Sequence, residues 1–214
     1  SRGVNPEFLL LLVVDTGPGP FTALRSACST AQGIAIATGV PAVGVSSTEA
    51  LAFQAARHFG VGRHDVLVVI DARMNEAYAA AVEVVLGEGG ELESLTEVRP
   101  CVVCPFDEVW SQAGLMPSNQ QGAPVVLAGN GATRCVGLLP ALKAAAQASG
   151  WTVVASEFAT AVRADALAEL GLWRASHLGV DTEKGIAPRY VRNKVALDIH
   201  EQAHARELAK AGTR

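Results

Sequence analysis

Apolar residues along the chain form short groups with two different spacings. Leu9 to Val14 is an unbroken Leu/Val run, which is typical of a strand buried on both faces. It ends in residues 15–20, where two glycines and two prolines exclude regular structure and predict a turn. The next apolar positions recur every three or four residues: Phe21, Leu24, Cys28, Ala31 and Ala35. This spacing predicts a helix from about Pro20 to Gly39.

The same alternation of strand and helix patterns continues along the rest of the chain. Short apolar segments predict further strands at residues 41–45, 66–71, 77–85, 95–103, 125–128 and 153–154. Longer patterns predict helices at residues 49–59, 106–113, 138–148, 160–176 and 196–211. Residues 72–76 fit the connection of a hairpin. Alternating elements of this kind predict an α/β fold.

Composition and charge narrow the classes of protein. The chain has 214 residues, of which 50% are apolar, so it can bury a core. Its 17 basic and 21 acidic residues give a net charge of −4, and no basic run suggests direct binding of nucleic acid. The longest apolar run, Phe8 to Val14, is far shorter than the roughly 20 residues of a membrane span. Four cysteines do not make a disulfide framework, so we expect a cytoplasmic protein.

Four segments resemble, in order, those of a known family. GPGPFTALR at residues 17–25 is similar to the Gly-Pro-Gly-Ser-Phe-Thr-Gly-Leu-Arg signature of the TsaB (YeaZ) family. PAVGVSSTEALA at 41–52, IDARMNEAY at 70–78 and PRYVRNKVA at 188–196 resemble its later segments. Pro20 stands where that family has serine, and Ala23 where it has glycine. The family also places a β-meander and a helix before the turn, and we expect the first lobe of this chain to lack them.

The resemblance implies a two-lobed fold of the actin/sugar-kinase/Hsp70 (ASKHA) type. We expect a first lobe at residues 1–62, a second at 63–186 and a carboxyl-terminal segment at 187–214 that returns to the first. The implied function is a non-catalytic subunit, without cofactor or metal, that helps a TsaD-type subunit place threonylcarbamoyl on adenosine 37 of tRNA. A TsaE-type ATPase and a second copy of the chain are further implied partners, and tRNA is contacted only indirectly.

The helix after the turn is predicted to bind the partner, with packing into the chain's own core as the alternative. Its side chains are small, which permits close approach of a second helix. The predicted partner-binding residues are Phe21, Leu24, Ala27, Cys28, Ala31 and Ala35. Other motif residues are expected to support the fold: Gly17, Gly19, Arg25, Asp71, Arg73, Glu76, Tyr78, Tyr190 and Arg192. Arg73 and Glu76 could pair across the turn, and Tyr190 and Arg192 should anchor the returning segment to the first lobe.

A zinc peptidase is the main alternative function, and a degenerate kinase-like nucleotide binder is a third. His200-Glu201-Gln202-Ala203-His204 matches the motif that places two histidine ligands on one face of a helix with a glutamate as base. The helix expected there is polar and terminal, so a solvated helix is the simpler interpretation.

Three other motifs also have a structural interpretation. Asp15-Thr16-Gly17 matches the turn of aspartic proteases, but that chemistry needs two carboxylates sharing a proton. Cys101 and Cys104 have the spacing of half a zinc or redox site, and we interpret them as small apolar residues. The Gly-Pro-Gly-Pro turn lies at a helix start, which favours anions, but its two prolines remove N–H donors. We interpret it as a sharp turn from strand to helix.

Overall fold

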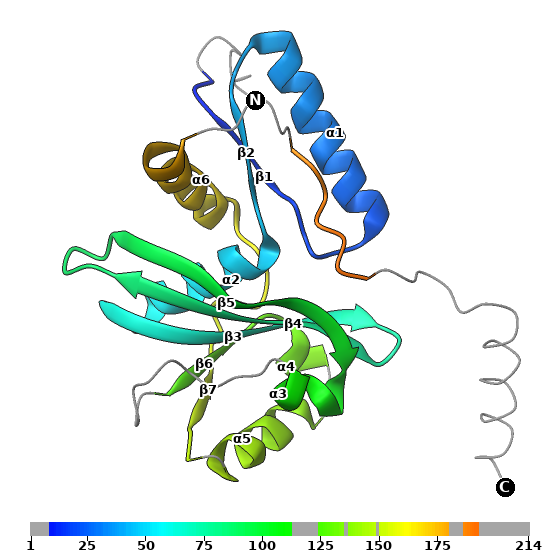
Figure 1. Cartoon of the computed structure of the whole chain (residues 1–214), viewed down its shortest axis with the longest axis vertical. Coiled ribbons are helices and arrows are strands. Elements are labelled where there is room, and N and C mark those ends of the chain that lie inside the picture. Colours follow the sequence, from blue (N-terminus) through cyan, green and yellow to red (C-terminus); the bar gives the residue numbers. More distant parts are fainter. Residues whose placement is uncertain (1–8, 113–123, 135–136, 149, 180–185, 193–214) are drawn as a thin grey trace, which may run out of the picture.

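The computed structural model describes residues 9–112, 124–134, 137–148, 150–179 and 186–192. Its strands form two sheets, which Figure 1 shows one above the other. The upper sheet is a parallel pair, β1 (Leu12–Asp15) and β2 (Ala42–Val45). The lower sheet has five strands in the order β5-β4-β3-β6-β7. The α/β class predicted from the alternating patterns is confirmed.

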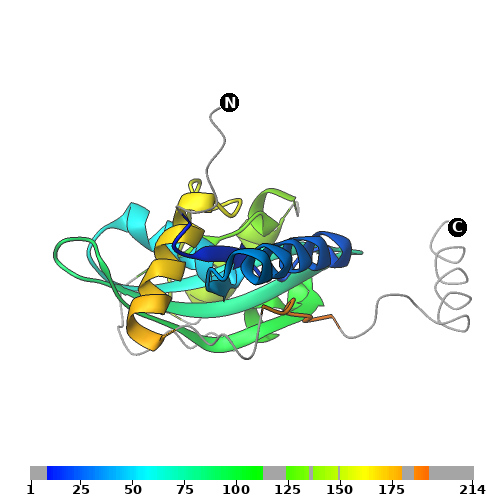
Figure 2. The same cartoon turned by 90° about the horizontal axis from the view of Figure 1, so that it is seen from above.

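The upper sheet lies between two helices, as its continuous apolar strand predicts. Helix α1 (Phe21–Thr38) packs on one face and α6 (Ala164–Leu178) on the other. Val14 lies in a cluster with Cys28 of α1, whereas the neighbouring Val13 packs toward α6. Adjacent strand residues point to opposite faces, so both faces of β1 are covered. In the view from above, α1 overlaps the lower sheet only in projection, because it packs on the upper sheet (Figure 1 and Figure 2).

The lower sheet combines antiparallel and parallel pairs. Its strands are β3 (Gly62–Arg73), β4 (Glu76–Leu86), β5 (Leu92–Pro105), β6 (Val125–Ala128) and β7 (Val153–Ala155). β3, β4 and β5 form an antiparallel meander, and β6 and β7 continue from β3 in parallel. The predicted hairpin connection at residues 72–76 is confirmed, since Arg73 of β3 and Glu76 of β4 are partners in the strand register on either side of the turn.

Helices cover both faces of the lower sheet. Helix α2 (Ser47–Phe59) packs on one face against β3, β4 and β6. The other face is covered by the 3-10 turn η2 (Phe106–Glu108) and by α3 (Val109–Gln112), α4 (Gly131–Arg134) and α5 (Leu138–Ala148). Ser46 begins α2 with a capping box: its side chain accepts from Glu49 N, and the Glu49 carboxylate accepts from Ser46 N.

One apolar core joins the two sheets. It contains residues of β2, all of the apolar face of α2, the facing side of the lower sheet, and Ala166 and Leu170 of α6. Helix α2, from the predicted first lobe, thus packs on the lower sheet, and α6, from the predicted second lobe, packs on the upper one. The lobe boundaries at residues 62 and 186 stay predictions.

Several predicted elements differ from the structure in their bounds: β3 begins at Gly62 and not at residue 66, and β5 spans Leu92–Pro105 and not 95–103. Two helix predictions also differ. In place of one helix at residues 106–113, the described residues 106–112 form the η2 turn followed by the short α3. The helix predicted to start at residue 160 starts at Ala164, after a segment whose carbonyl at Ala161 accepts from the Gln54 side chain. The terminal helix predicted at residues 196–211 lies outside the described residues.

Candidate functional site

The turn from β1 into α1 is a tightly packed structural feature. Gly17 has a φ of +102°, and a Cβ atom there would lie 2.7 Å from Leu24 Cδ1. Only glycine meets both conditions without distortion. A Cβ at Gly19 would make ordinary contact with Leu24 Cδ2, at 3.7 Å. Pro20 precedes the helix and supplies no side-chain cap. These contacts favour the structural interpretation of the turn.

The Asp15 side chain stabilises this turn through its hydrogen bonds. Its carboxylate accepts hydrogen bonds from Gly17 N at 2.8 Å and from Ser47 Oγ at 2.7 and 2.9 Å. Burial raises the pKa of the Asp15 carboxyl, while the hydrogen bonds from Gly17 and Ser47 act in the opposite direction. No second carboxylate hydrogen-bonds to Asp15 among the described residues, so they contain no aspartic-protease dyad. Sequence reasoning missed this contact, because Ser47 is 32 positions away and nothing in the 41–52 segment links it to Asp15.

The predicted partner-binding residues of α1 face mainly inward. Leu24 and Cys28 are buried, and Cys28 packs with Val14 and Ile186 in the chain's own core. These two side chains therefore offer no surface to a partner. Phe21, Ala27, Ala31 and Ala35 are half-buried. Packing into the chain's own core was the alternative predicted for this face, and Leu24 and Cys28 follow it.

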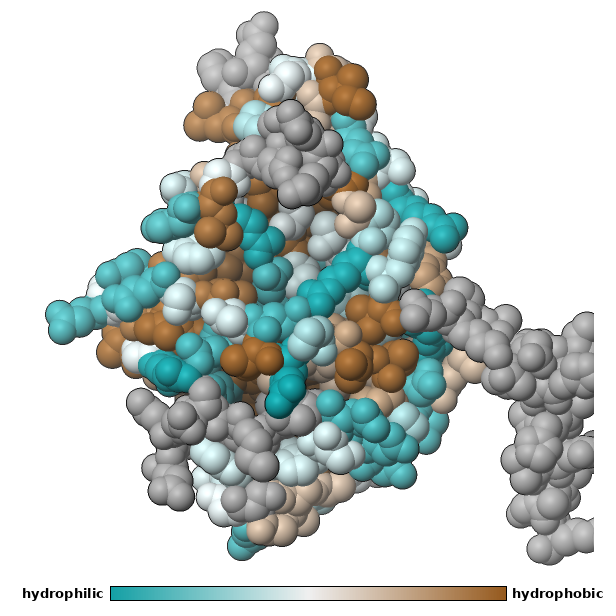
Figure 3. All heavy atoms as spheres, in the orientation of Figure 1, coloured by the Kyte–Doolittle hydropathy of each residue, from teal (hydrophilic) through white to brown (hydrophobic). Residues whose placement is uncertain are grey.

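The opposite face of α1 is exposed and also consists of small residues. Its exposed positions include Ala23, Ser26, Thr30, Gly33 and Ala37. A Cβ built at Gly33 would meet nothing within 4 Å. Ile36, near the end of the helix, is 84% exposed. Figure 3 shows mixed hydrophilic and apolar spheres over this part, with apolar side chains at the top of the molecule near the end of α1.

Residues 186–192, here called the returning segment, lie beside α1 and the upper sheet and reach the lower one. Its first contacts are with α1 and the end of β1: Gln32 Nε2 donates to Ile186 O, and Arg189 N donates to Thr16 O at 2.7 Å. Tyr190 accepts from Arg25 Nε at 2.9 Å. The anchoring role predicted for Tyr190 thus has a defined contact on α1.

Arg192 differs from that expectation, because it anchors to the lower sheet. Its guanidinium donates to Ala72 O at 3.0 Å and pairs with the Glu76 carboxylate. Arg189 likewise pairs with Glu97 of β5 at 2.6 Å. The returning segment therefore ties the two sheets together. The sequence contains no local signal for these pairs, which join residues 92 and 116 positions apart.

The hairpin residues singled out from the sequence have separate roles. The sequence suggested an ion pair between the side chains of Arg73 and Glu76, but the structure does not contain it. The Arg73 guanidinium lies 3.6 Å from the Asp71 carboxylate instead. The Asp71 side chain also accepts from Arg73 N at 2.8 Å, and Glu76 is taken by Arg192. Tyr78 is buried in a small cluster with Ala72, Ala80 and Cys101.

Cys101 and Cys104 cannot act as a pair. Cys101 lies in the cluster with Tyr78, whereas Cys104 lies in the core on the opposite face of the sheet. Burial raises the pKa of Cys101 to about 12 and that of Cys104 to about 11, so both thiols stay protonated at neutral pH. They are small core residues, as interpreted from the sequence.

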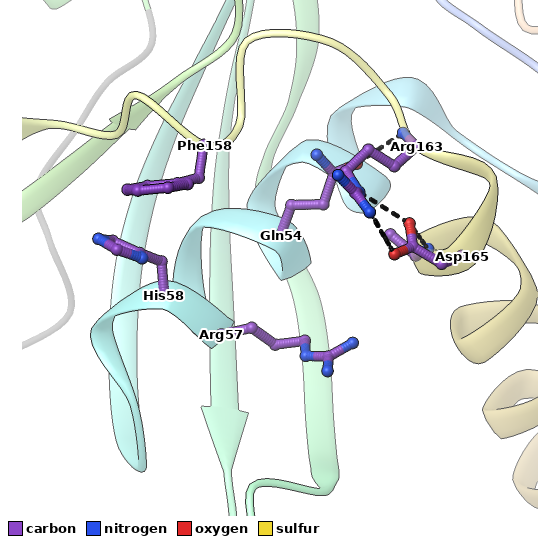
Figure 4. Close-up of a pocket in the computed structure, with 7 residues that line it drawn as sticks. Gln54, Arg57, His58, Phe158, Arg163 and Asp165 are labelled. Carbon is purple, nitrogen blue, oxygen red and sulfur yellow. Dashed lines mark hydrogen bonds and ion pairs between the residues drawn. The ribbon is translucent and has the colours of Figure 1, made fainter.

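A shallow pocket of about 230 Å³ lies between α2 and the segment before α6 (Figure 4). His58 and Phe158 stack on one side of it, with ring centres 3.8 Å apart. On the other side Arg163 pairs with Asp165 at 2.8 Å. Gln54 is held by Ala161 O and Arg163 N. Because its polar groups already have partners, this pocket has little capacity left to bind a ligand.

Metal ligation is not supported within the described residues. They contain no group of three or more His, Cys, Asp or Glu side chains placed to hold a metal ion. His200, Glu201 and His204, the residues of the zinc-peptidase alternative, lie outside the described residues. None of the described helices has the length and apolar character of a membrane span.

The fold and its segments define a class of protein. Residues 1–169 match the family model described as TsaD: tRNA N6-adenosine threonylcarbamoyltransferase. The fold is similar to two solved structures from Pseudomonas aeruginosa. One is YeaZ, with a TM-score of 0.62 and 26% identity over 87% of this chain and 77% of that chain. The other, described as similar to peptidase YEAZ, has a TM-score of 0.59 and 27% identity over 88% and 76%. The chain thus has the two-sheet ASKHA-like fold of these proteins.

Curated relatives carry the name expected from the motifs. The TsaB protein of Escherichia coli K12, named for tRNA threonylcarbamoyladenosine biosynthesis, is 44% identical over 80 residues, 37% of this chain and 34% of that protein. The TsaB protein of Haemophilus influenzae is 35% identical over 114 residues, 52% and 48% of the two chains. The matches thus span a third to a half of the curated relatives' length. The chain belongs to the TsaD family and, within it, to the TsaB (YeaZ) proteins, which confirms the resemblance.

Proposed function

We propose that this chain is a non-catalytic subunit of the machinery that forms N6-threonylcarbamoyladenosine at position 37 of tRNA. Its role is to dock a TsaD-type catalytic subunit through the outward face of α1. The names of its TsaB relatives support a role in tRNA threonylcarbamoyladenosine biosynthesis. The match to the TsaD model supports a fold shared with the catalytic partner. The observation that carries the docking role is the exposed, small-sided face of α1.

The exposed face of α1 has the spacing of a helix-pairing seam. Ala23, Ser26, Thr30, Gly33 and Ala37 follow one another at intervals of three and four residues. An average spacing of 3.5 is the one that keeps a seam facing a second helix over several turns. The helix has 18 residues, a length of about 27 Å. Small side chains along it let a partner helix approach at the short end of the usual 8–10 Å range.

The rest of the structure holds this helix in a fixed position. The Gly17 turn sets its start, the Asp15–Ser47 contact joins that turn to α2, and Gly39 in the left-handed conformation ends it. The returning segment also holds α1 through hydrogen bonds to the side chains of Gln32 and Arg25. A helix fixed at both ends loses little conformational entropy on docking, so this arrangement supports tight pairing.

Co-purification with a tagged TsaD-type subunit tests the proposal. Ala23→Glu places a charged side chain on the exposed seam without reaching the core, and we expect it to reduce recovery of the partner at least tenfold. Thr30→Glu, two seam positions further along, should have the same effect. Glutamate at Ala27 or Ala31 is less informative, because both are half-buried against the chain's own core.

Ala168→Glu is the matched control. Ala168 is an exposed alanine on α6, on the other side of the upper sheet, so the same substitution there should leave recovery unchanged. Equal recovery of the partner with Ala23→Glu, Thr30→Glu and Ala168→Glu would exclude this face as the docking surface.

The proposal has consequences for the other expected partners. A second copy of the chain would compete for the same seam, so addition of the TsaD-type subunit should convert a homodimer into a heterodimer. A TsaE-type ATPase would bind the pair and not this chain alone. The tRNA would be held mainly by the catalytic subunit, in keeping with a net charge of −4.

A further inference from the structure

The returning segment covers the hairpin end of the lower sheet. Side chains alternate along a strand, so the even-numbered residues of β4 share one face of the sheet. Helix α2 covers that face at Val82 and Val84. Nearer the β3–β4 hairpin the face is formed by a small cluster, against which Val191 of the returning segment packs. In Figure 1 the segment (orange) runs from beside α1 toward this end of the sheet. The cluster, here called the hairpin cluster, consists of Ala72, Tyr78, Ala80 and Cys101.

Two ion pairs hold the segment over the hairpin cluster. Arg192 pairs with Glu76, and Arg189 pairs with Glu97 at 2.6 Å. Oε1 of Glu97 also accepts from Cys101 N at 3.2 Å, so the second ion pair adjoins a residue that carries a buried thiol. Movement of the segment away from the sheet therefore breaks both ion pairs and uncovers the cluster.

The upper end of the segment is held independently of the lower sheet. Ile186 is buried in a cluster with Val14 and Cys28. Arg189 N donates to Thr16 O at 2.7 Å, just beyond the end of β1. These contacts combine apolar burial with a backbone hydrogen bond, and neither depends on the side chains that reach the lower sheet.

The contacts with the lower sheet are weaker. Val191 is half-buried, and the side chains of Glu76 and Arg189 are 36% and 32% exposed. Ion pairs that water reaches add little net stability. Arg192 Nε is buried without a hydrogen-bond partner among the residues that the structure describes, and such a donor disfavours the closed position. A segment held in this way can open locally while the rest of the fold stays intact.

We propose that residues 190–192, together with the Arg189 side chain, form a releasable strap over the hairpin cluster. In the open state the Cys101 thiol faces water, and Tyr190 leaves Arg25 of α1, while the upper end of the segment stays in place. The strap thus links the cover of the lower sheet to the first turns of α1. This conformational device goes beyond the docking function and operates without a partner.

The Cys101 thiol reports the state of the strap, because a buried thiol reacts only when it is exposed to water. The whole chain is treated with N-ethylmaleimide, and peptide mass spectrometry follows the modification of each cysteine separately. We expect Arg189→Ala and Arg192→Ala each to raise the modification rate of Cys101 about tenfold or more, since each removes one ion pair of the strap. Cys104 lies in the core on the opposite face of the sheet and should keep its wild-type rate.

Arg25→Ala tests whether the strap moves as a unit. Arg25 lies on α1, outside the hairpin cluster, and contacts the strap at Tyr190. Its removal should also raise the modification rate of Cys101. A purely local effect of Arg189 and Arg192 on the packing around the thiol would not produce that result.

Arg57→Ala is the matched control. It removes an ion pair of 2.6 Å with Glu169, between α2 and α6, and should leave the rate at Cys101 unchanged. The proposal is overturned if Cys101 keeps its wild-type rate in any of the three strap variants, or if Arg57→Ala raises that rate equally. It is also overturned if Cys104 speeds up as much as Cys101, because the whole fold would then be opening. No partner is present in these measurements, so this proposal and the docking proposal fail independently.

Discussion

Arg25 Nε donates a hydrogen bond of 2.9 Å to the hydroxyl of Tyr190, which follows it by 165 positions. The Arg25 guanidinium also lies over the Tyr190 ring, 5.6 Å from its centre, and the Phe21 ring lies 5.2 Å away from that ring. The side chains join the first turns of α1 to the returning segment. A helix proposed to receive a partner is thus held by a segment that also contacts the lower sheet through Arg192.

Substitutions at this contact should show coupled effects on stability. Tyr190→Phe removes the hydrogen bond and keeps the ring contacts, so we expect a loss of under about 1 kcal/mol in the free energy of unfolding. Arg25→Ala removes the hydrogen bond and the contacts of the guanidinium with the rings of Tyr190 and Phe21, so it should cost more. In a double-mutant cycle by urea unfolding, we expect a coupling of about 0.5–1 kcal/mol. A coupling of zero would mean that the contact does not hold the segment.

The sequence predicts what is local in this structure. The bounds of β1 and α1 were predicted to within a few residues. The prediction used the Leu/Val run of β1, the apolar spacing of α1 and the glycine after that helix. The strand at residues 125–128 and the helix at 138–148 have the predicted bounds. In each case the pattern of apolar positions coincides with burial, because the element packs through one defined face.

Contacts between distant residues could not be predicted in the same way. The spacing of α1 gave its apolar face, but not which of its residues pack into the chain's own core. Leu24 and Cys28 are buried there, and Cys28 lies in a cluster with Ile186. Likewise Glu76 was expected to pair with nearby Arg73 and instead pairs with Arg192. Ionic partners depend on how the chain returns on itself, which no local pattern records.

Gly171 allows α6 to lie close to β1. A Cβ atom there would be 2.2 Å from Val13 Cγ2, so Gly171→Ala must push the helix away from the strand. We expect a loss of about 1–3 kcal/mol in the free energy of unfolding, measured by urea titration. Val13→Ala should restore part of that loss in the double variant, because it removes the colliding methyl groups.

Gly33→Ala is the control for that substitution. Gly33 also lies inside a helix, but a Cβ there would meet nothing within 4 Å. Alanine should therefore stabilise the chain by about 0.4–1 kcal/mol through the unfolded state. Equal effects at positions 33 and 171 would mean that the packing of α6 on β1 is looser than described.

The thiols of Cys101 and Cys104 should be inert in the folded chain. Both are buried, and their pKa values of about 12 and 11 leave almost no thiolate at pH 8. We expect a disulfide reagent to modify them at least 100-fold faster in urea than in buffer. Cys135 lies outside the described residues, so a Cys135→Ser background removes its signal. Thr30→Cys adds an exposed thiol as a positive control. Rapid modification of the folded chain that lacks this added thiol would contradict the burial of Cys101 and Cys104.

The carboxyl of Asp15 should make stability depend on pH in a defined direction. Burial raises its pKa in the folded chain above the usual 3.8, so the folded state binds this proton more tightly than the unfolded state does. The contribution of Asp15 to stability therefore falls as pH rises from 3.8 through the raised value, and stays low above it. The Asp15→Asn variant cannot titrate at this position, yet the oxygen of its side-chain amide can still accept from Gly17 N and Ser47 Oγ.

Comparison of the wild type with Asp15→Asn isolates this contribution, because the other titrating groups cancel. Urea unfolding of both chains between about pH 4 and pH 7 should show the wild type losing stability relative to the variant as pH rises. The opposite slope would mean that the hydrogen bonds from Gly17 and Ser47 outweigh burial and hold the pKa below its usual value. Ser47→Ala separates the two effects: it removes one hydrogen bond and should make the wild-type slope steeper.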